Sequence, residues 1–183
     1  MSTFTDESRL LIDNWDTVED ILEACDRLGE ELMAVLLSLE SDLGQMDWWN
    51  ELWHFEQGRG SQVHISHENW KTDRGYAILI GVWHMEPEYV FGSGGPGLYV
   101  YVGGGNSELR AELVDGLQDR GDSLPGEVDT RGSSNSAAVQ GMNRYIGGDI
   151  EKYIAETKEQ ILSFFSAYAK RLLEINERIQ QHL

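Results

Sequence analysis

Cysteine, lysine and proline are scarce in this chain of 183 residues, which contains one cysteine, four lysines and three prolines. A single cysteine, Cys25, excludes a disulfide within the chain, so we expect a reducing, cytoplasmic location. No apolar run approaches the roughly 20 residues of a membrane span. Met1–Arg9 also lacks the basic flank and apolar core of a signal peptide. We therefore expect a protein without a membrane segment.

Positive charge is also scarce, and the formal net charge is -18. Few lysines and many carboxylates are typical of proteins from salt-loving microbes and their viruses, because carboxylates keep a surface hydrated where salt screens their repulsion. A chain of this charge is repelled by phosphates, so we expect no direct binding of nucleic acid. An alternative is an acidic DNA mimic, which would occupy a basic groove on a partner.

Residues 1–45 have the pattern of one long helix. A stripe with steps of four and three residues runs through Leu11, Trp15, Val18, Leu22, Cys25, Leu32, Leu36, Leu39 and Leu43. Gly29 takes the missing stripe position and marks a possible kink. Because Cys25 lies in the stripe, we interpret it as a small buried hydrophobe and not as a nucleophile.

Residues 148–183 predict a second long helix that begins near Asp149. Its apolar residues keep helical spacing from Ile154 to Ile179. We expect the two terminal helices to pack on each other and on the sheet between them. A homodimer through these helices is an alternative.

Residues 60–147 between the helices predict a small, mainly antiparallel sheet with one short helix. The expected strands and helix are Ser61–Trp70, Tyr76–Met85, Leu98–Val102, the helix Ser107–Asp119, and a hairpin of Val128–Arg131 and Ala137–Ile146 around the turn Gly132–Ser136. Tyr76–Met85 is apolar on both faces, which is typical of a central strand. The sequence thus predicts a single α+β domain with the order α-β-β-β-α-β-β-α.

Four of the five histidines lie between His54 and His84, which raises the possibility of a metal site. On strand parity, His64 and His84 would face each other across a strand pair, with Glu86 on the same face. His67 forms an H-x-x-H with His64, but on a strand the two would point to opposite faces. The candidate ligands are therefore His64, His84 and Glu86, as in a small metal-dependent hydrolase.

Aromatic side chains are concentrated in the segment from Trp48 to Phe55. Trp48, Trp49, Trp53 and Trp70 are candidates for a partner-binding surface, because large aromatic residues dominate binding hot spots. The alternative is a buried collar where the first helix meets the sheet.

The sequence contains no recognisable catalytic set or cofactor motif. The glycine clusters Gly92–Gly97 and Gly103–Gly105 lack the spacing and the Lys-Ser/Thr of nucleotide-binding loops, and we interpret them as tight turns. Glu127 and Asp129 would share one face of a strand, which this acidic composition produces by chance. We therefore expect no cofactor.

The second half of the chain, roughly residues 76–175, resembles a known domain in its order of elements. A strand, a helix, a hairpin ending at Arg144-Tyr145-Ile146 and a long closing helix are similar to the α+β accessory domain of unknown function beside PD-(D/E)xK nuclease-like domains. Glu156-Thr157-Lys158 has the E-x-K spacing but lies in a helical pattern. The resemblance implies a recognition or scaffolding module linked to a defence or DNA-processing system, without cleavage by this chain.

The leading interpretation is a non-enzymatic interaction or regulatory protein with a protein partner. It would act through the tryptophan-rich segment, the terminal helices, or both.

Overall fold

The computed structural model describes residues 5–118, 124–130 and 135–183. Its helices are α1 Asp6–Asp13, α2 Trp15–Leu43, α3 Pro87–Val90, α4 Ser107–Gln118, α5 Ile150–Glu174 and α6 Asn176–Gln180, with the 3-10 turns η1 Glu68–Trp70 and η2 Gly103–Gly105. Its strands are β1 Trp53–Gln57, β2 Val63–His67, β3 Lys71–Thr72, β4 Gly75–Tyr76, β5 Ile78–Trp83, β6 Gly97–Val102, β7 Glu127–Val128 and β8 Ser136–Gly141. The predicted α+β fold is confirmed.

The main sheet has six strands in the order β1-β2-β5-β6-β8-β7, and every neighbouring pair is antiparallel. The register places Ile65 beside Ile80 and Val100 beside Ala138 on one buried face. The predicted central strand is β5, which is paired on both sides. The apolar run of β5 had indicated a strand in the middle of a sheet with a buried, β-branched face.

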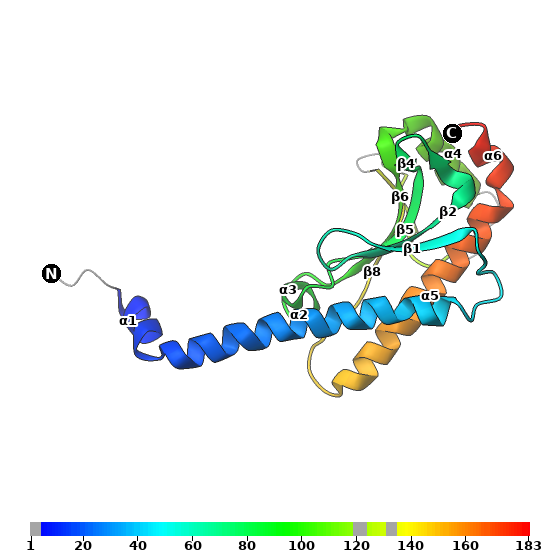
Figure 1. The fold of residues 1–183 in the computed structure, drawn as a ribbon. Helices are drawn as coiled ribbons and strands as arrows, with labels where there is room; N and C mark the ends of the chain where they lie inside the picture. The colour runs from blue at the N-terminus through cyan, green and yellow to red at the C-terminus, as the bar shows by residue number, and fades with distance from the viewer. Residues whose placement is uncertain (1–4, 119–123, 131–134) are drawn as a thin grey trace.

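Helices cover one face of this sheet (Figure 1). α5 packs against β5 and β6, and its Ile161, Phe165 and Leu172 are fully buried. α2 crosses α5, and the ion pair from Lys158 to Asp42, with 2.7 Å between Nζ and Oδ2, joins the two helices. The predicted packing of the terminal helices on each other and on the sheet therefore holds for the C-terminal half of α2.

Both terminal helices are broken once, at positions that the sequence pattern did not indicate. The first break is at Asn14, which separates α1 from α2, whereas α2 runs through Gly29 as one helix. The side chain of Asn14 donates to the carbonyl of Leu10 and so competes with the helical ladder. The second break is at Ile175, between α5 and α6. The expected kink at Gly29 is wrong.

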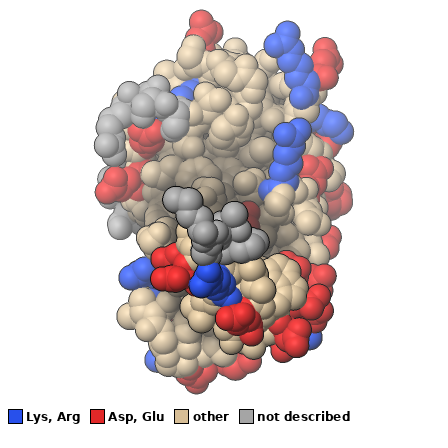
Figure 2. All heavy atoms as spheres, turned by 90° about the vertical axis from the view of Figure 1, so that its left-hand side faces the viewer, with Lys and Arg blue, Asp and Glu red and all other residues tan. Residues whose placement is uncertain are grey.

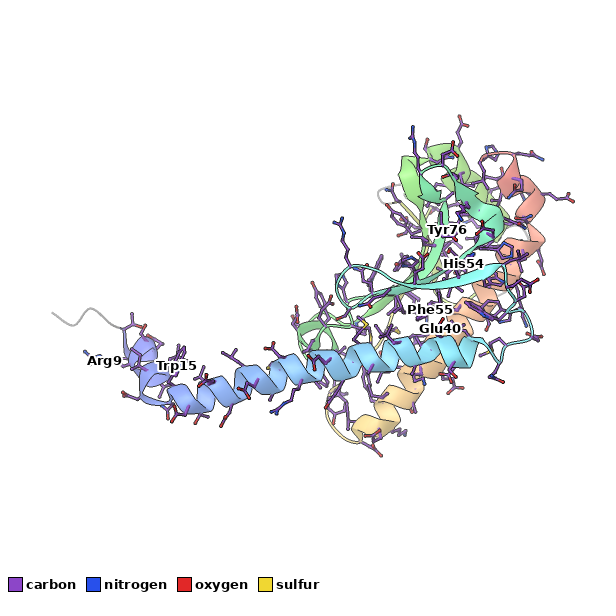
Figure 3. All side chains as sticks on the ribbon, viewed as in Figure 1. Arg9, Trp15, Glu40, His54, Phe55 and Tyr76 are labelled. Carbon is purple, nitrogen blue, oxygen red and sulfur yellow. The ribbon has the colours of Figure 1, made fainter. Side chains whose placement is uncertain are left out.

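The strand β1 was not predicted, although its residues alternate. Phe55 points from β1 toward α2, whereas His54 lies on the other side of the sheet beside Tyr76, with 5.5 Å between the ring centroids (Figure 3). The predicted hairpin exists as the antiparallel pair β7–β8. Residues 132–134 of its predicted turn and residue 131 of its predicted first strand lie outside the described residues. The second strand ends at Gly141 and not at Ile146.

On the sheet face turned away from α5, aromatic rings lie over cross-strand glycines. Tyr99 pairs with Gly81 and its ring fills the space that a side chain at Gly81 would take; Trp83 covers Gly97 in the same way. The Trp83 and Tyr99 rings stack with 4.8 Å between their centroids. Burial raises the pKa of Tyr99 to about 12, so its phenol stays neutral at ordinary pH.

Candidate interaction site

Four tryptophans predicted to form a partner-binding surface gather where α2 meets the sheet. Trp53 is the centre of the cluster, with 5.2 Å to the Trp48 ring and 5.4 Å to the Trp70 ring, both nearly perpendicular to it. The indole nitrogen of Trp48 donates to Ser166 at 3.0 Å. That of Trp70 donates to Asn176 at 3.0 Å and so ties η1 to α6.

The burial of this cluster matches the collar alternative. Trp48, Trp53 and Trp70 are 8%, 4% and 0% exposed, so they offer almost no surface to a partner in this fold. Trp49 is half-buried and stacks on Trp53, with 6.1 Å between the centroids. His67 lies against Trp53, and burial lowers the pKa of His67, which favours its neutral form.

The three predicted metal ligands do not converge. His64 lies opposite Gly81, and His84 comes after the end of β5 with a φ of 61°, so the prediction that the two histidines face each other is wrong. Alternation says which face a residue takes, but it does not fix the register. His64 contacts Glu56 at 3.3 Å, and the His84 ring stacks on Tyr89. Throughout the described residues, no three His, Cys, Asp or Glu side chains form a group that could hold a metal ion.

The other sequence motifs have structural roles. Gly104 and Gly105 adopt positive φ in η2, and the Asn106 side chain accepts the Leu109 N–H at the start of α4, where an anion would have to bind. Glu156 and Lys158 of the E-x-K sequence lie on α5 and pair with Lys152 and Asp42. These contacts explain the motifs without a nucleotide or a nuclease centre.

A different feature is exposed: the N-terminal arm, which we define as residues 6–31, comprising α1 and the first half of α2. It projects away from the rest of the molecule, with Arg9 and Trp15 near its far end (Figures 1 and 3). All its residues are described and none is buried. Large apolar side chains on it are 51–66% exposed: Leu10, Leu11, Ile12, Trp15, Ile21 and Leu22.

One apolar stripe therefore has two environments. Leu32, Leu36, Leu39 and Leu43 are at most 3% exposed and belong to the core, whereas Leu11, Trp15 and Leu22 of the arm are 51–57% exposed. Cys25 is exposed too, so its interpretation as a buried hydrophobe is wrong. An exposed helix of this length gains little stability from its backbone alone, because most helical stability in proteins comes from packing an apolar face. Large contiguous apolar patches are uncommon on the surface of soluble monomers, which makes the arm the candidate interaction site.

The arm is also strongly acidic. Asp6–Glu31 contains ten acidic residues and two arginines. Glu19 and Asp26 directly follow stripe positions and so flank the stripe along one side. The arm is thus an apolar stripe bordered by carboxylates.

At the base of the arm, α2 and α3 enclose a groove of about 690 Å³, the arm-base groove. It lies between α2, α3 and the turn joining β1 to β2, and its lining residues are Cys25, Asp26, Leu28, Gly29, Ser61, Glu86, Pro87, Glu88, Phe91 and Gly92. Glu86 Oε1 accepts the Ser61 N–H at 3.3 Å. Glu86 Oε2 is buried without a hydrogen-bond partner in the described part of the chain, and His84 Nδ1 lies 4.0 Å from it.

Sequence reasoning did not identify this groove. The available signal was Gly29, the glycine at a stripe position of an otherwise regular helix. The sequence does not indicate that Gly29 lies near Glu86 or Phe91. These residues are distant in the chain, and only the folding of the strands between them brings α3 next to α2. Figure 2, which views the molecule from the side toward which the arm projects, also shows a central hollow lined by uncharged residues.

No protein-family model, curated protein or solved structure matches this chain. None of the helices in the described ranges has the length and apolar character needed to cross a bilayer.

Proposed function

We propose that this chain is a non-enzymatic interaction protein that captures a basic, amphipathic helix of another protein on its N-terminal arm. The observation that supports the proposal is the exposed stripe of Leu11, Trp15 and Leu22 on helices that leave the body. Trp15–Glu31 spans about 25 Å at 1.5 Å per residue. That length offers a partner helix more than two heptads of apolar contact.

Charge complementarity favours a basic partner over a second copy of this chain. Two arms side by side would bring ten acidic residues against ten, with two arginines on each side. In an antiparallel pair, Glu19 and Asp26 would face the same carboxylates of the other copy, which is destabilising. Lysine or arginine beside the stripe of a partner helix would instead pair with these carboxylates.

The apolar stripe also distinguishes docking of a basic helix from DNA mimicry, because the two modes of binding respond differently to salt. A mimic presents carboxylates where DNA presents phosphates, and its competition with DNA weakens steeply as salt rises. Apolar docking depends on buried area and survives added salt better. A halophilic or viral origin, and the nuclease-linked system that the resemblance implies, stay predictions that the identity of the natural partner would test.

The test uses a designed 28-residue helix with leucine at its a and d positions and arginine at e and g. We expect the protein to bind this peptide by fluorescence anisotropy, and a peptide with glutamate at e and g not to bind. Leu22→Ser should weaken binding about tenfold, because Leu22 loses roughly 1.4 kcal/mol of apolar burial in the complex.

Leu37→Ser is the matched control. Leu37 lies on the body half of α2, is 42% exposed and is outside the stripe, so the same substitution there should leave the affinity unchanged. Equal effects of the two substitutions, or equal binding of the arginine and glutamate peptides, would contradict docking on the arm.

A further inference from the structure

A small pocket, the aromatic pocket, lies on the sheet face turned away from α5, across strands β2, β5 and β6 (Figure 1). Its volume is about 290 Å³, at the lower end of the range of ligand pockets, so it suits a ligand of about one ring. Leu79, Trp83, Tyr99 and Tyr101 line it. None of the described residues that line it belongs to the N-terminal arm, so its chemistry can be considered separately from helix docking.

Two hydrogen-bond donors of the aromatic pocket have no acceptor. Tyr99 is 6% exposed, yet its hydroxyl makes no hydrogen bond to a described residue, and the same holds for the indole nitrogen of Trp83. Because the pKa of Tyr99 is raised to about 12 by burial, the hydroxyl keeps its proton and stays a donor. Buried tyrosine and tryptophan side chains usually have a hydrogen-bond partner, since an unpaired donor costs free energy. A ligand with acceptor oxygens would supply both partners.

Two glycines of the sheet help to hold these donors in place. The hydroxyl end of Tyr99 lies over Gly81, and the indole nitrogen of Trp83 lies over Gly97, each in the space that a Cβ would occupy. The two rings also stack on each other. Groups that are fixed before a ligand arrives lose less conformational entropy on binding, so this packing favours a preformed site.

Other residues of the aromatic pocket supply acceptors. Gln62 lines it from the turn between β1 and β2, and His64 lines it from β2. His64 Nε2 lies 3.3 Å from Glu56 Oε2, so the neutral imidazole carries its proton on Nε2 and presents Nδ1 as an acceptor. The amide of Gln62 both donates and accepts. The pocket therefore combines donors and acceptors with aromatic walls.

This combination distinguishes between classes of ligand. The described residues that line the pocket include no Asp, Glu, Lys or Arg, and the chain has a net charge of -18, so a phosphate would meet no cation and would be repelled. A quaternary ammonium ion accepts no hydrogen bond and would leave Tyr99 and Trp83 unpaired. A sugar ring is neutral, its hydroxyls donate and accept, and its C–H faces pack on aromatic rings.

We infer that the aromatic pocket binds a neutral pyranose ring, either as a monosaccharide or as one unit of a glycan. Tyr99 and Trp83 donate to oxygens of the sugar, and Gln62 and His64 accept from its hydroxyls. This binding site is additional to the proposed docking of a helix and does not depend on it.

The experiment presents the protein with the methyl glycosides of glucose, galactose, mannose and N-acetylglucosamine, and follows binding by saturation-transfer NMR and titration calorimetry. Choline and uridine monophosphate represent the ammonium and phosphate classes. We expect at least one glycoside to bind with a millimolar Kd, and choline and uridine monophosphate not to bind. A tetrasaccharide of the sugar that binds should bind more tightly if the natural ligand is a glycan, and equally tightly if it is a monosaccharide.

Variants of the pocket test where the sugar binds. Tyr99→Phe keeps the ring over Gly81 and removes only the hydroxyl, so it should weaken binding about fivefold, the value of one hydrogen bond. Gln62→Ala lies in a turn, where it leaves the sheet intact, and should weaken binding by a similar factor. Tyr76→Phe is the matched control, because its hydroxyl donates to Glu68 outside the pocket and its loss should leave the affinity unchanged.

Three results would overturn the inference. The first is that none of the glycosides binds, and the second is that choline or uridine monophosphate binds and displaces a glycoside. The third is that Tyr99→Phe and Gln62→Ala, with melting curves that show a folded protein, bind the glycoside as tightly as the wild type. Leu22→Ser should leave sugar binding unchanged, so failure of the helix-docking proposal would not affect this result.

Discussion

Two leucines of the same stripe provide a direct test of whether the arm is free. Leu22 and Leu36 both lie on α2 at stripe positions, but Leu22 is 57% exposed and Leu36 is fully buried. Replacing each by alanine removes the same atoms from the same helix. The two substitutions therefore differ only in what surrounds the side chain.

The expected magnitudes are far apart. Leu36→Ala should lower the free energy of unfolding by about 2–5 kcal/mol, because it loses apolar burial and leaves a cavity. For a chain of this length, about 3 kcal/mol corresponds to a fall in melting temperature of roughly 6–12 °C. Leu22→Ala should change the free energy of unfolding by less than about 0.5 kcal/mol, because the site is exposed and alanine is the better helix former.

Thermal and urea unfolding, followed by circular dichroism over a hundredfold range of protein concentration, measure both effects. If Leu22→Ala costs more than about 1 kcal/mol at every concentration, the arm packs on the body and the proposed docking surface does not exist. If the cost grows with protein concentration, the arms bind each other, as the homodimer alternative predicts, and a basic partner is no longer needed.

Three further predictions concern the sheet and the aromatic collar. Gly81→Ala should cost about 1–3 kcal/mol in urea unfolding, because the new methyl group overlaps the Tyr99 ring; unchanged stability would show that the ring moves aside. Burial raises the pKa of both Tyr99 and Tyr168 to about 12. The unfolded chain therefore releases these protons first, and stability should fall between about pH 10 and 12 by at most about 1.4 kcal/mol per pH unit for each tyrosine, a slope that Tyr99→Phe reduces. Trp70→Phe should cost roughly 1–3 kcal/mol, since it shrinks a buried ring and leaves Asn176 without its donor; a melting curve equal to that of the wild type would contradict this role.

Hydrophobic periodicity determined much of the architecture. The two-sided apolar run of Tyr76–Met85 gave the central strand, and the three- and four-residue steps gave the long helices. These patterns are local, so they identify the type of element and the face that is apolar. They do not say what covers that face, and this is why one stripe predicted burial at both Leu22 and Leu36.

The sequence did not determine the pairing register of the strands either. Strand parity correctly placed His64 on the face opposite Ile65, but pairing put Gly81 beside it, and His84 lies past the end of β5. Similarly, tryptophan density at Trp53 suggested either a collar or a surface, and only the packing of α2 and α5 against the sheet buried it. Each of these outcomes depends on contacts between residues distant in the chain.

By itself, then, the sequence determined the α+β class, the apolar faces and the acidity, because composition and periodicity are properties of neighbouring residues. Only the tertiary structure decided that the arm stays outside the core while α3 meets α2 at Gly29. The physical reason is that a core of this size is filled by the sheet, α4, α5 and the second half of α2. The arm extends past that core, so its apolar side chains stay exposed.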